Sequence, residues 1–208
     1  MNSNQSGRSM IEMLGVLAIV GVLSVGGIAG YSKAMSKAKT NHFISQSSEL
    51  VMNIRNLYIS QHSFEGLNNE ALINTGFVPT EMLNQDTSPH SIRHAFSGNV
   101  IVYESKISNG LPKAFEIYFT GLEHQACLLL ATMDWGQDPA SGFQSIYAGV
   151  AEISAPLMLN AFGGGDSFPD QNIYTSGLHD DAAPLTVNEA SAACNCTTNT
   201  CVIGLKYI

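Results

Sequence analysis

The chain has 208 residues, of which 45% are apolar and 12% are charged, a composition typical of a folded protein rather than a disordered one. Its net charge of −8 is unevenly distributed. The residues up to Phe43 include four basic side chains and one acidic one, whereas those after Phe43 include five basic and sixteen acidic ones. Because an acidic surface repels phosphates, the composition argues against nucleic acid as a partner.

An uncharged apolar stretch runs from Met13 to Tyr31. Its nineteen residues are close to the roughly 20 that a helix needs to cross a bilayer. The polar segment "MNSNQSG" precedes Arg8, and no small-residue cleavage site follows the apolar stretch, so the order differs from that of a secretory signal peptide. If a peptidase cuts this chain, Gly7 is the expected place, and the apolar helix then stays on the mature protein.

Glu12 is a single carboxylate at the start of this apolar stretch. A carboxylate at membrane depth costs about 2.5 to 3.5 kcal/mol on insertion scales, so we expect it to be paired or functional. The alternative is that Glu12 lies at the headgroup boundary, where water still solvates it. We favour a pairing in which Glu12 and the freed amine of Arg8 on a neighbouring subunit neutralise each other.

The pattern of Gly7, Arg8, Glu12 and about twenty apolar positions resembles the class III leader of type IV pilins and the related pseudopilins. The resemblance implies that prepilin peptidase cuts after Gly7, that the new N-terminal residue Arg8 is methylated, and that Glu12 serves in filament assembly. Two features differ from the family pattern: Arg8 stands where an apolar residue is usual, and the leader lacks a basic residue of its own.

The same resemblance implies a structural subunit rather than an enzyme. The precursor is expected in the bacterial inner membrane, and the mature chain in an extracellular pilus for adhesion, aggregation, motility or DNA uptake. Implied partners are further pilin subunits in a homopolymer, prepilin peptidase, and the assembly platform with its ATPase; no cofactor is implied. The alternatives are a minor pilin or tip adhesin, or a type II secretion pseudopilin. The sequence contains no nucleophile elbow, P-loop or dinucleotide fingerprint.

After the apolar stretch the helical pattern continues. Apolar residues recur at spacings of three, four and seven, on a stripe formed by Phe43, Leu50, Val51, Ile54, Leu57 and Tyr58. We expect Asn41, Gln46, Glu49, Asn53 and Asn56 on the other faces. The predicted organisation is a leader at 1–7, an apolar helix at 8–31, its amphipathic continuation at 32–61 and a globular head at 62–208.

The head is predicted to begin with a loop region containing short helical pieces, among them "NEALINTG", which Gly76 closes. The β-branched and aromatic stretches "GNVIVYES" and "KAFEIYFTG" predict an antiparallel hairpin around Asn109-Gly110. The stretch "GLEHQACLLLATMDWG" is helical in character, and "CVIGLKYI" predicts a closing strand. The stretch "SIYAGVAEISAPLMLNAF" fits either a strand pair or an interrupted helix. The fold class is therefore α+β, with a long N-terminal helix on an antiparallel sheet; it resembles a type IVb pilin.

Four cysteines, Cys127, Cys194, Cys196 and Cys201, are expected to form disulfides if the head lies outside the cytoplasm. The family resemblance implies that Cys127 pairs with Cys194 or Cys201, with the remaining two closing a short loop. The alternative is a metal site of three thiolates completed by His124 or His179, but the spacing is not a usual zinc pattern, and we predict no metal.

Two weaker groups of residues remain. His90 and His94 either share a helical face or are ordinary solvated or packed histidines, and the loop context favours the second interpretation. Asp166, Asp170, Asp180 and Asp181 offer oxygen ligands of the kind that calcium uses, without a loop signature that fixes their geometry.

Overall fold

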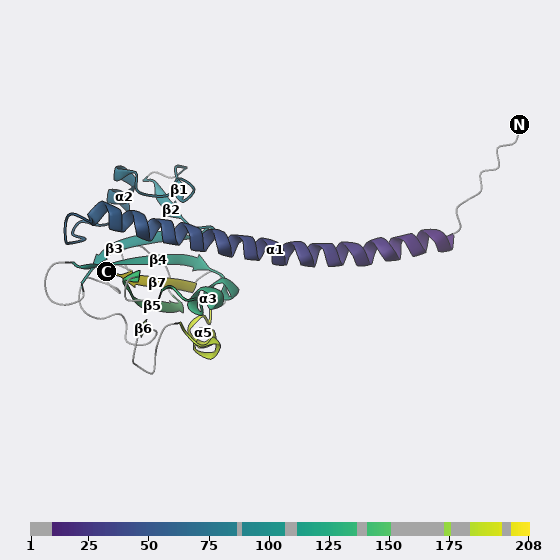
Figure 1. Cartoon of the computed structure of the whole chain (residues 1–208). Helices are drawn as coiled ribbons and strands as arrows, with labels where there is room; N and C mark the ends of the chain where they lie inside the picture. The colour runs from purple at the N-terminus through teal and green to yellow at the C-terminus, as the bar shows by residue number, and fades with distance from the viewer. Residues whose placement is uncertain are drawn as a thin grey trace, which may run out of the picture. The chain divides into compact units, whose positions relative to one another are not determined.

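The computed structural model describes residues 10–86, 89–106, 112–136, 141–150, 173–175, 184–196 and 201–208. The chain divides into two compact units, Met1–Asn41 and His42–Ile208. Helix α1 (Met10–Tyr58) runs through this boundary as one continuous helix (Figure 1). It ends three residues before the predicted limit of the amphipathic segment, and residues 59–61 form a turn instead.

The part of α1 in the second unit carries the expected apolar stripe. Phe43, Leu50 and Ile54 are fully buried, and the exposure of Val51 and Tyr58 is 8% each. One polar prediction is wrong: the side chain of Gln46 is only 4% exposed and lies on the buried side of the helix. The error arises because Gln46 adjoins the stripe on the helical wheel, three residues after Phe43 and four before Leu50.

After α1 in the chain comes α2 (Asn69–Thr75), a short capped helix. The Asn68 side chain accepts a hydrogen bond from the backbone N–H of Ala71, and Gly76 closes the helix with a positive φ of 74°. This confirms the predicted helix and its glycine stop. Two short strands that the sequence did not predict follow, β1 (Leu83–Asn84) and β2 (Ser91–Arg93).

The predicted strand pair is confirmed: β3 (Asn99–Ser105) and β4 (Ala114–Leu122) pair antiparallel. The predicted turn residues Asn109 and Gly110 lie outside the described residues. Helix α3 (His124–Ala131) follows and is shorter than the predicted helical stretch, whose first residues belong to β4 and whose last residues follow the helix. The stretch "SIYAGVAEISAPLMLNAF", which fits either a strand pair or an interrupted helix, begins as a strand, because its first residues belong to β5 (Phe143–Val150). β6 (Ile173–Thr175) pairs with β5.

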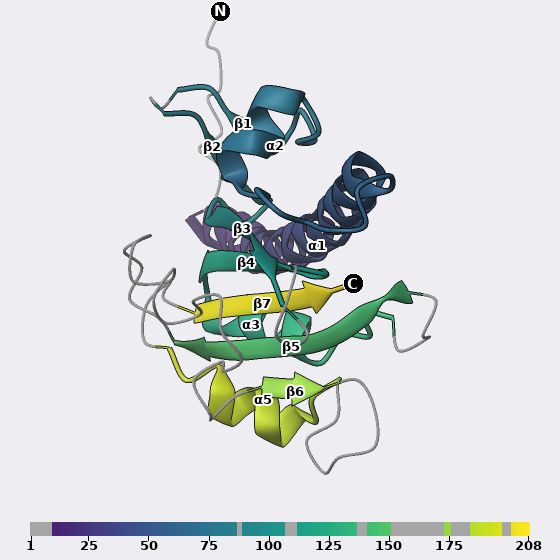
Figure 2. The same cartoon turned by 90° about the vertical axis from the view of Figure 1, so that its left-hand side faces the viewer.

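The chain closes with α5 (Val187–Ala193), which the sequence did not predict, and with the predicted strand β7 (Cys201–Tyr207). β7 lies between β4 and β5, in an antiparallel sheet whose described strands have the order β1-β2-β3-β4-β7-β5-β6 (Figure 2). The last strand is therefore an interior strand of the sheet, paired along both of its edges.

One face of the sheet packs against α1. The ring centroids of Phe43 and Phe119 are 4.6 Å apart, and the core continues over β7 and β5 through residues such as Leu205 and Ile146. Cys127 of α3 and Ala190 of α5 belong to the same core. The described residues of the head thus form a hydrophobic core of their own, in agreement with the predicted α+β class.

The opposite face contains a second cluster around Tyr118 and a buried carboxylate. Glu116 is 6% exposed and accepts hydrogen bonds from the hydroxyls of Ser105 at 2.6 Å and Tyr118 at 2.5 Å. The ammonium of Lys206 lies 3.4 Å from a Glu116 oxygen. A buried charge is tolerated when it is paired and hydrogen-bonded, and these three partners meet that condition.

Candidate assembly site

The residues predicted to act in assembly lie at the N-terminal end of α1. Gly7 and Arg8 precede Met10 and lie outside the described residues, so their predicted roles remain predictions. Glu12 lies in the first turn of α1 and is exposed. A carboxylate in a first turn is favoured by the unpaired N–H groups and the positive end of the helix dipole. This position leaves the Glu12 oxygens accessible to a partner outside the chain.

The helix after Glu12 presents apolar side chains in every direction. Val22 is 74% exposed, Leu23 69% and Ile28 70%, and no residue of the most apolar eighteen-residue window is buried. By length and hydropathy this helix is able to cross a membrane. An apolar surface of this extent on a folded chain indicates a contact with lipid or with other protein. The first unit is therefore an anchor or an assembly surface.

The four cysteines form two disulfides near the end of the head. Cys127 of α3 is bonded to Cys194 at the end of α5, and Cys196 is bonded to Cys201 at the start of β7. This is one of the two arrangements that the family resemblance implies. The sulfur atoms of Cys127, Cys194 and Cys201 lie within 4.8 Å of one another, but all three are consumed in disulfides, so this cluster has no thiolate for a metal.

The two histidines of "HSIRH" do not share a helical face, because the residues between them form β2. His90 is exposed, whereas His94 is 4% exposed and lies among Phe43, Phe96 and Phe119. Its Nε2 donates to the carbonyl of Thr120 at 2.9 Å, and its Nδ1 accepts from the N–H of Phe96 at 3.2 Å. Burial lowers the pKa of His94 from 6.5 to about 4. His94 is thus a neutral core residue.

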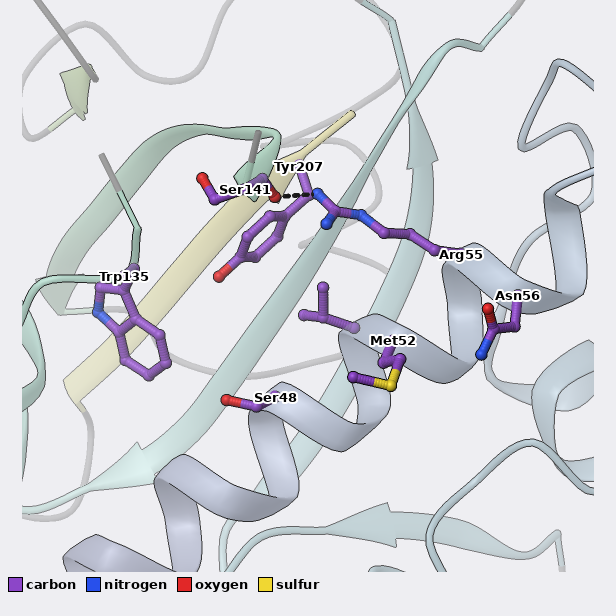
Figure 3. Close-up of a pocket in the computed structure, with 8 residues that line it drawn as sticks. Ser48, Met52, Arg55, Asn56, Trp135, Ser141 and Tyr207 are labelled. Atoms are coloured by element: carbon purple, nitrogen blue, oxygen red, sulfur yellow. Dashed lines mark hydrogen bonds between the residues drawn. The ribbon is translucent and has the colours of Figure 1, made fainter. Parts of the chain in front are cut away.

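The remaining candidates are placed as follows. His124 forms a hydrogen bond of 2.6 Å between its Nδ1 and the backbone carbonyl of Cys194. His179 and the four aspartates considered for calcium lie outside the described residues. Sequence reasoning missed the buried Gln46 and a groove beside the C-terminal part of α1, which is lined by Met52, Arg55, Trp135 and Tyr207 among others (Figure 3). A lone arginine within an amphipathic helix is the only sequence signal for that groove.

The fold resembles those of solved type IV pilins. It matches the type IVb pilin of Salmonella typhi with a TM-score of 0.50, 16% identity, and coverage of 79% of this chain and 97% of that one. It matches TcpA, a type IV pilin of Vibrio cholerae El Tor, with a TM-score of 0.55, 16% identity, and coverage of 82% and 99%. At this identity the likeness shows the fold, which is that of the type IV pilins.

Sequence comparison identifies the family. The bundlin family model matches residues 32–151, which is more than half of the chain. Two relatives, from Escherichia coli O111:H- and from Escherichia coli O127:H6, are each described as the major structural subunit of bundle-forming pilus. Each is 29% identical over 196 residues, covering 94% of this chain and 91% of the relative. The chain belongs to the bundlin family of type IV pilins, whose members are structural pilus subunits.

Proposed function

We propose that this chain is made as an inner-membrane precursor, is cut after Gly7 by prepilin peptidase, and is then polymerised through α1 into an extracellular pilus. The observation that carries the proposal is the exposed apolar part of α1 with Glu12 in its first turn, followed by a head whose described residues form their own core. Such a helix serves first as a membrane anchor and then as the packing surface of a filament.

Glu12 has a specific part in this proposal. The cut after Gly7 creates a free amine at Arg8, four residues before Glu12. When two helices pack side by side in an apolar environment, an unpaired carboxylate and an unpaired amine are both costly. We therefore assign to Glu12 the neutralisation of the Arg8 amine of a neighbouring subunit, which sets the register between adjacent helices.

The position in the pilus is proposed to be that of the major subunit, with the assembly platform and its ATPase as partners of the precursor. Two facts support this role: both relatives are major structural subunits of a bundle-forming pilus, and their similarity covers 94% of this chain. A minor pilin or tip adhesin has the same anchor and fold, so the amount of the chain in the filament distinguishes the two roles.

The test is the intact mass of the protein in sheared surface filaments from its host, with and without reduction. We expect this chain to be the most abundant pilin there, to begin at Arg8, and to be one methyl group heavier than the unmodified chain. The two disulfides make the unreduced protein lighter by four hydrogens. A chain that still carries Met1–Gly7 and stays in the membrane fraction would overturn the proposal. A correctly processed chain in trace amounts would identify a minor pilin.

A further inference from the structure

Three lysines follow the apolar stretch of α1. Lys33, Lys37 and Lys39 are exposed and lie on the part of the helix that belongs to the first unit. They are the first charged residues after Glu12 in the sequence, and Glu12 is the only acidic residue of that unit. Within the described residues, none of the three forms an ion pair. We call these three residues the lysine group.

The spacing between Glu12 and the lysine group matches the thickness of a bilayer. Glu12 and Lys33 are 21 positions apart, which corresponds to about 32 Å along the axis of a helix. The hydrocarbon core of a bilayer is about 30 Å thick. If α1 crosses this core with Glu12 at one edge, Lys33 therefore emerges at the other edge, among the lipid headgroups.

The side chains of the lysine group lean back toward the apolar stretch. The Cα–Cβ bonds of an α-helix tilt toward its N-terminus, and the lysines lie on the C-terminal side of that stretch. Lys37 and Lys39 are about 6 and 9 Å beyond Lys33 along the axis, and their long side chains are able to return their ammonium groups to the headgroup layer. Tyr31, which is 68% exposed, precedes the group, and tyrosine is enriched at the membrane–water interface.

The lysines occupy two sides of the helix. At about 100° per residue, Lys37 lies about 40° from Lys33 around the axis, whereas Lys39 lies about 120° from Lys33 in the opposite direction. A single protein surface contacts one side of a helix, but headgroups surround an inserted helix on every side. This distribution therefore favours a lipid leaflet over one neighbouring protein as the partner of the lysine group.

The charge of the head gives these lysines a purpose at this place in the chain. Sixteen acidic and five basic residues follow Phe43, so an anionic leaflet repels the head. Lys39 is only four positions before Phe43. Attraction between the lysine group and an anionic leaflet offsets this repulsion at the point where the chain leaves the membrane.

We propose that the lysine group binds the phosphates of anionic phospholipids, in the leaflet that the head faces, while the chain is a membrane precursor. The inference rests on the proposed function, because it requires α1 to span a membrane, and it adds a lipid partner to the precursor. A lysine near an anionic membrane surface strengthens binding about fivefold.

The test uses the full-length chain in phosphatidylcholine vesicles with a trace of spin-labelled phosphatidylglycerol or spin-labelled phosphatidylcholine. Electron paramagnetic resonance distinguishes lipid immobilised at the protein from free lipid and gives the relative association constant of the two labelled lipids. We expect the wild-type chain to prefer phosphatidylglycerol about fivefold or more at low salt. The preference should fall below about twofold in about 1 M salt, because salt screens exposed charges.

Three variants locate the source of this preference. Lys33→Gln/Lys37→Gln/Lys39→Gln keeps the whole uncharged stretch, so it should still insert, but its preference should fall below about twofold at low salt. Lys33→Arg/Lys37→Arg/Lys39→Arg conserves the charge and should keep the preference, since guanidinium also binds phosphate. Lys113→Gln removes an exposed lysine of the head and should leave the preference within about twofold of the wild type.

A wild-type preference below about twofold at low salt would overturn the inference, as would an undiminished preference in the glutamine variant. If that variant lost filaments but kept the preference, the partner of the lysines would be an acidic protein surface, which also overturns it. A wild-type chain that failed to insert into vesicles would instead contradict the proposed function. Insertion without any lipid preference would contradict the lysine group alone.

Discussion

The two parts of α1 have the same secondary structure but very different surroundings within the chain. From Met10 to Met35, the large apolar side chains are exposed, as in Leu23 at 69%. From Phe43 onward, the apolar side chains of the same helix are buried in the core of the head, as in Ile54 at 0%. The first part has its packing partners outside the chain, and the second part has them inside it.

Because of this difference, substitutions in the first part of α1 should affect filament assembly, and substitutions in the second part should affect the stability of the head. A substitution in the first part removes contacts that exist only in a membrane or a filament, so it leaves the folding of the head unchanged. A substitution in the second part removes contacts within the folded head and lowers the free energy of unfolding. The comparison therefore predicts two kinds of phenotype along one helix.

The largest effects are expected from two single substitutions that are compared with each other, Phe43→Ala and Glu12→Ala. Phe43 is fully buried, with the rings of Phe119 and Trp135 at centroid distances of 4.6 Å and 6.3 Å, and its truncation should cost about 3 to 5 kcal/mol of unfolding free energy. Glu12→Ala should leave that free energy unchanged and abolish filaments. Urea unfolding followed by the fluorescence of Trp135, the single tryptophan, measures the first effect in detergent-solubilised protein, and sheared filament yield measures the second.

Glu49→Ala is the matched control for Glu12→Ala, because it removes another exposed carboxylate of the same helix within the second unit. It should change neither filament yield nor unfolding. Normal assembly by Glu12→Ala would refute the pairing with the Arg8 amine. Destabilisation of the head by Glu12→Ala would refute the separation between the two parts of α1.

A second test compares the two disulfides inside the head. Cys127–Cys194 joins residues 67 positions apart, whereas Cys196–Cys201 spans 5. In the chain-entropy account, the long closure stabilises by about 4 kcal/mol and the short one by about 2 kcal/mol. Cys127→Ala/Cys194→Ala should therefore lower the unfolding free energy more than Cys196→Ala/Cys201→Ala does. Double variants are needed, because a single one leaves a thiol beside the other disulfide.

Equal urea midpoints for the two double variants would show that loop closure is not the dominant contribution of these bonds. The wild-type protein under reducing conditions is the matched reference, since it loses both closures without a change of side chain. Its unfolding free energy should lie below that of either double variant.

Much of this architecture was predictable, because the signals are local and repeated. The apolar run, the stripe from Phe43 to Tyr58 and the alternating residues of β3 and β4 each extend over several residues with one period. The stop at Gly76 was predictable for a different reason: a single glycine supplies the positive φ that a helix end requires.

The missed elements depend on contacts or on short signals. β1 and β2 have two and three residues, too few to show a period, and they exist through pairing with β3 and with each other. α5 did have a signal: Thr186 and Glu189 form a capping box. The groove lined by Met52, Arg55, Trp135 and Tyr207 brings together α1, the segment after α3 and the end of β7. These segments are far apart in the chain, and no sequence pattern encodes their proximity in space.

The last effect we predict is a pH dependence of the stability of the head, through His94. Its pKa is about 4 in the folded protein, against an ordinary 6.5, because burial disfavours the charged ring. Between these pH values the unfolded chain binds a proton that the folded chain does not, so the unfolding free energy falls as the pH falls. The shift corresponds to a loss of about 3 kcal/mol between pH 6.5 and pH 4.

The structure gives this shift a local cause, which a variant is able to isolate. Nδ1 of His94 accepts from the N–H of Phe96, so protonation there would set two N–H groups against each other. His94→Gln should be less stable at pH 7 and should lose most of this pH dependence, whereas His42→Gln, at a half-exposed histidine paired with Glu81, should keep it. Urea midpoints of the three proteins from pH 7 to pH 4 measure both effects. If the unfolding free energy of His94→Gln fell with pH as steeply as that of the wild type, the acid sensitivity would lie in other groups, and the buried His94 would contribute to packing beside α1 but not to the pH dependence.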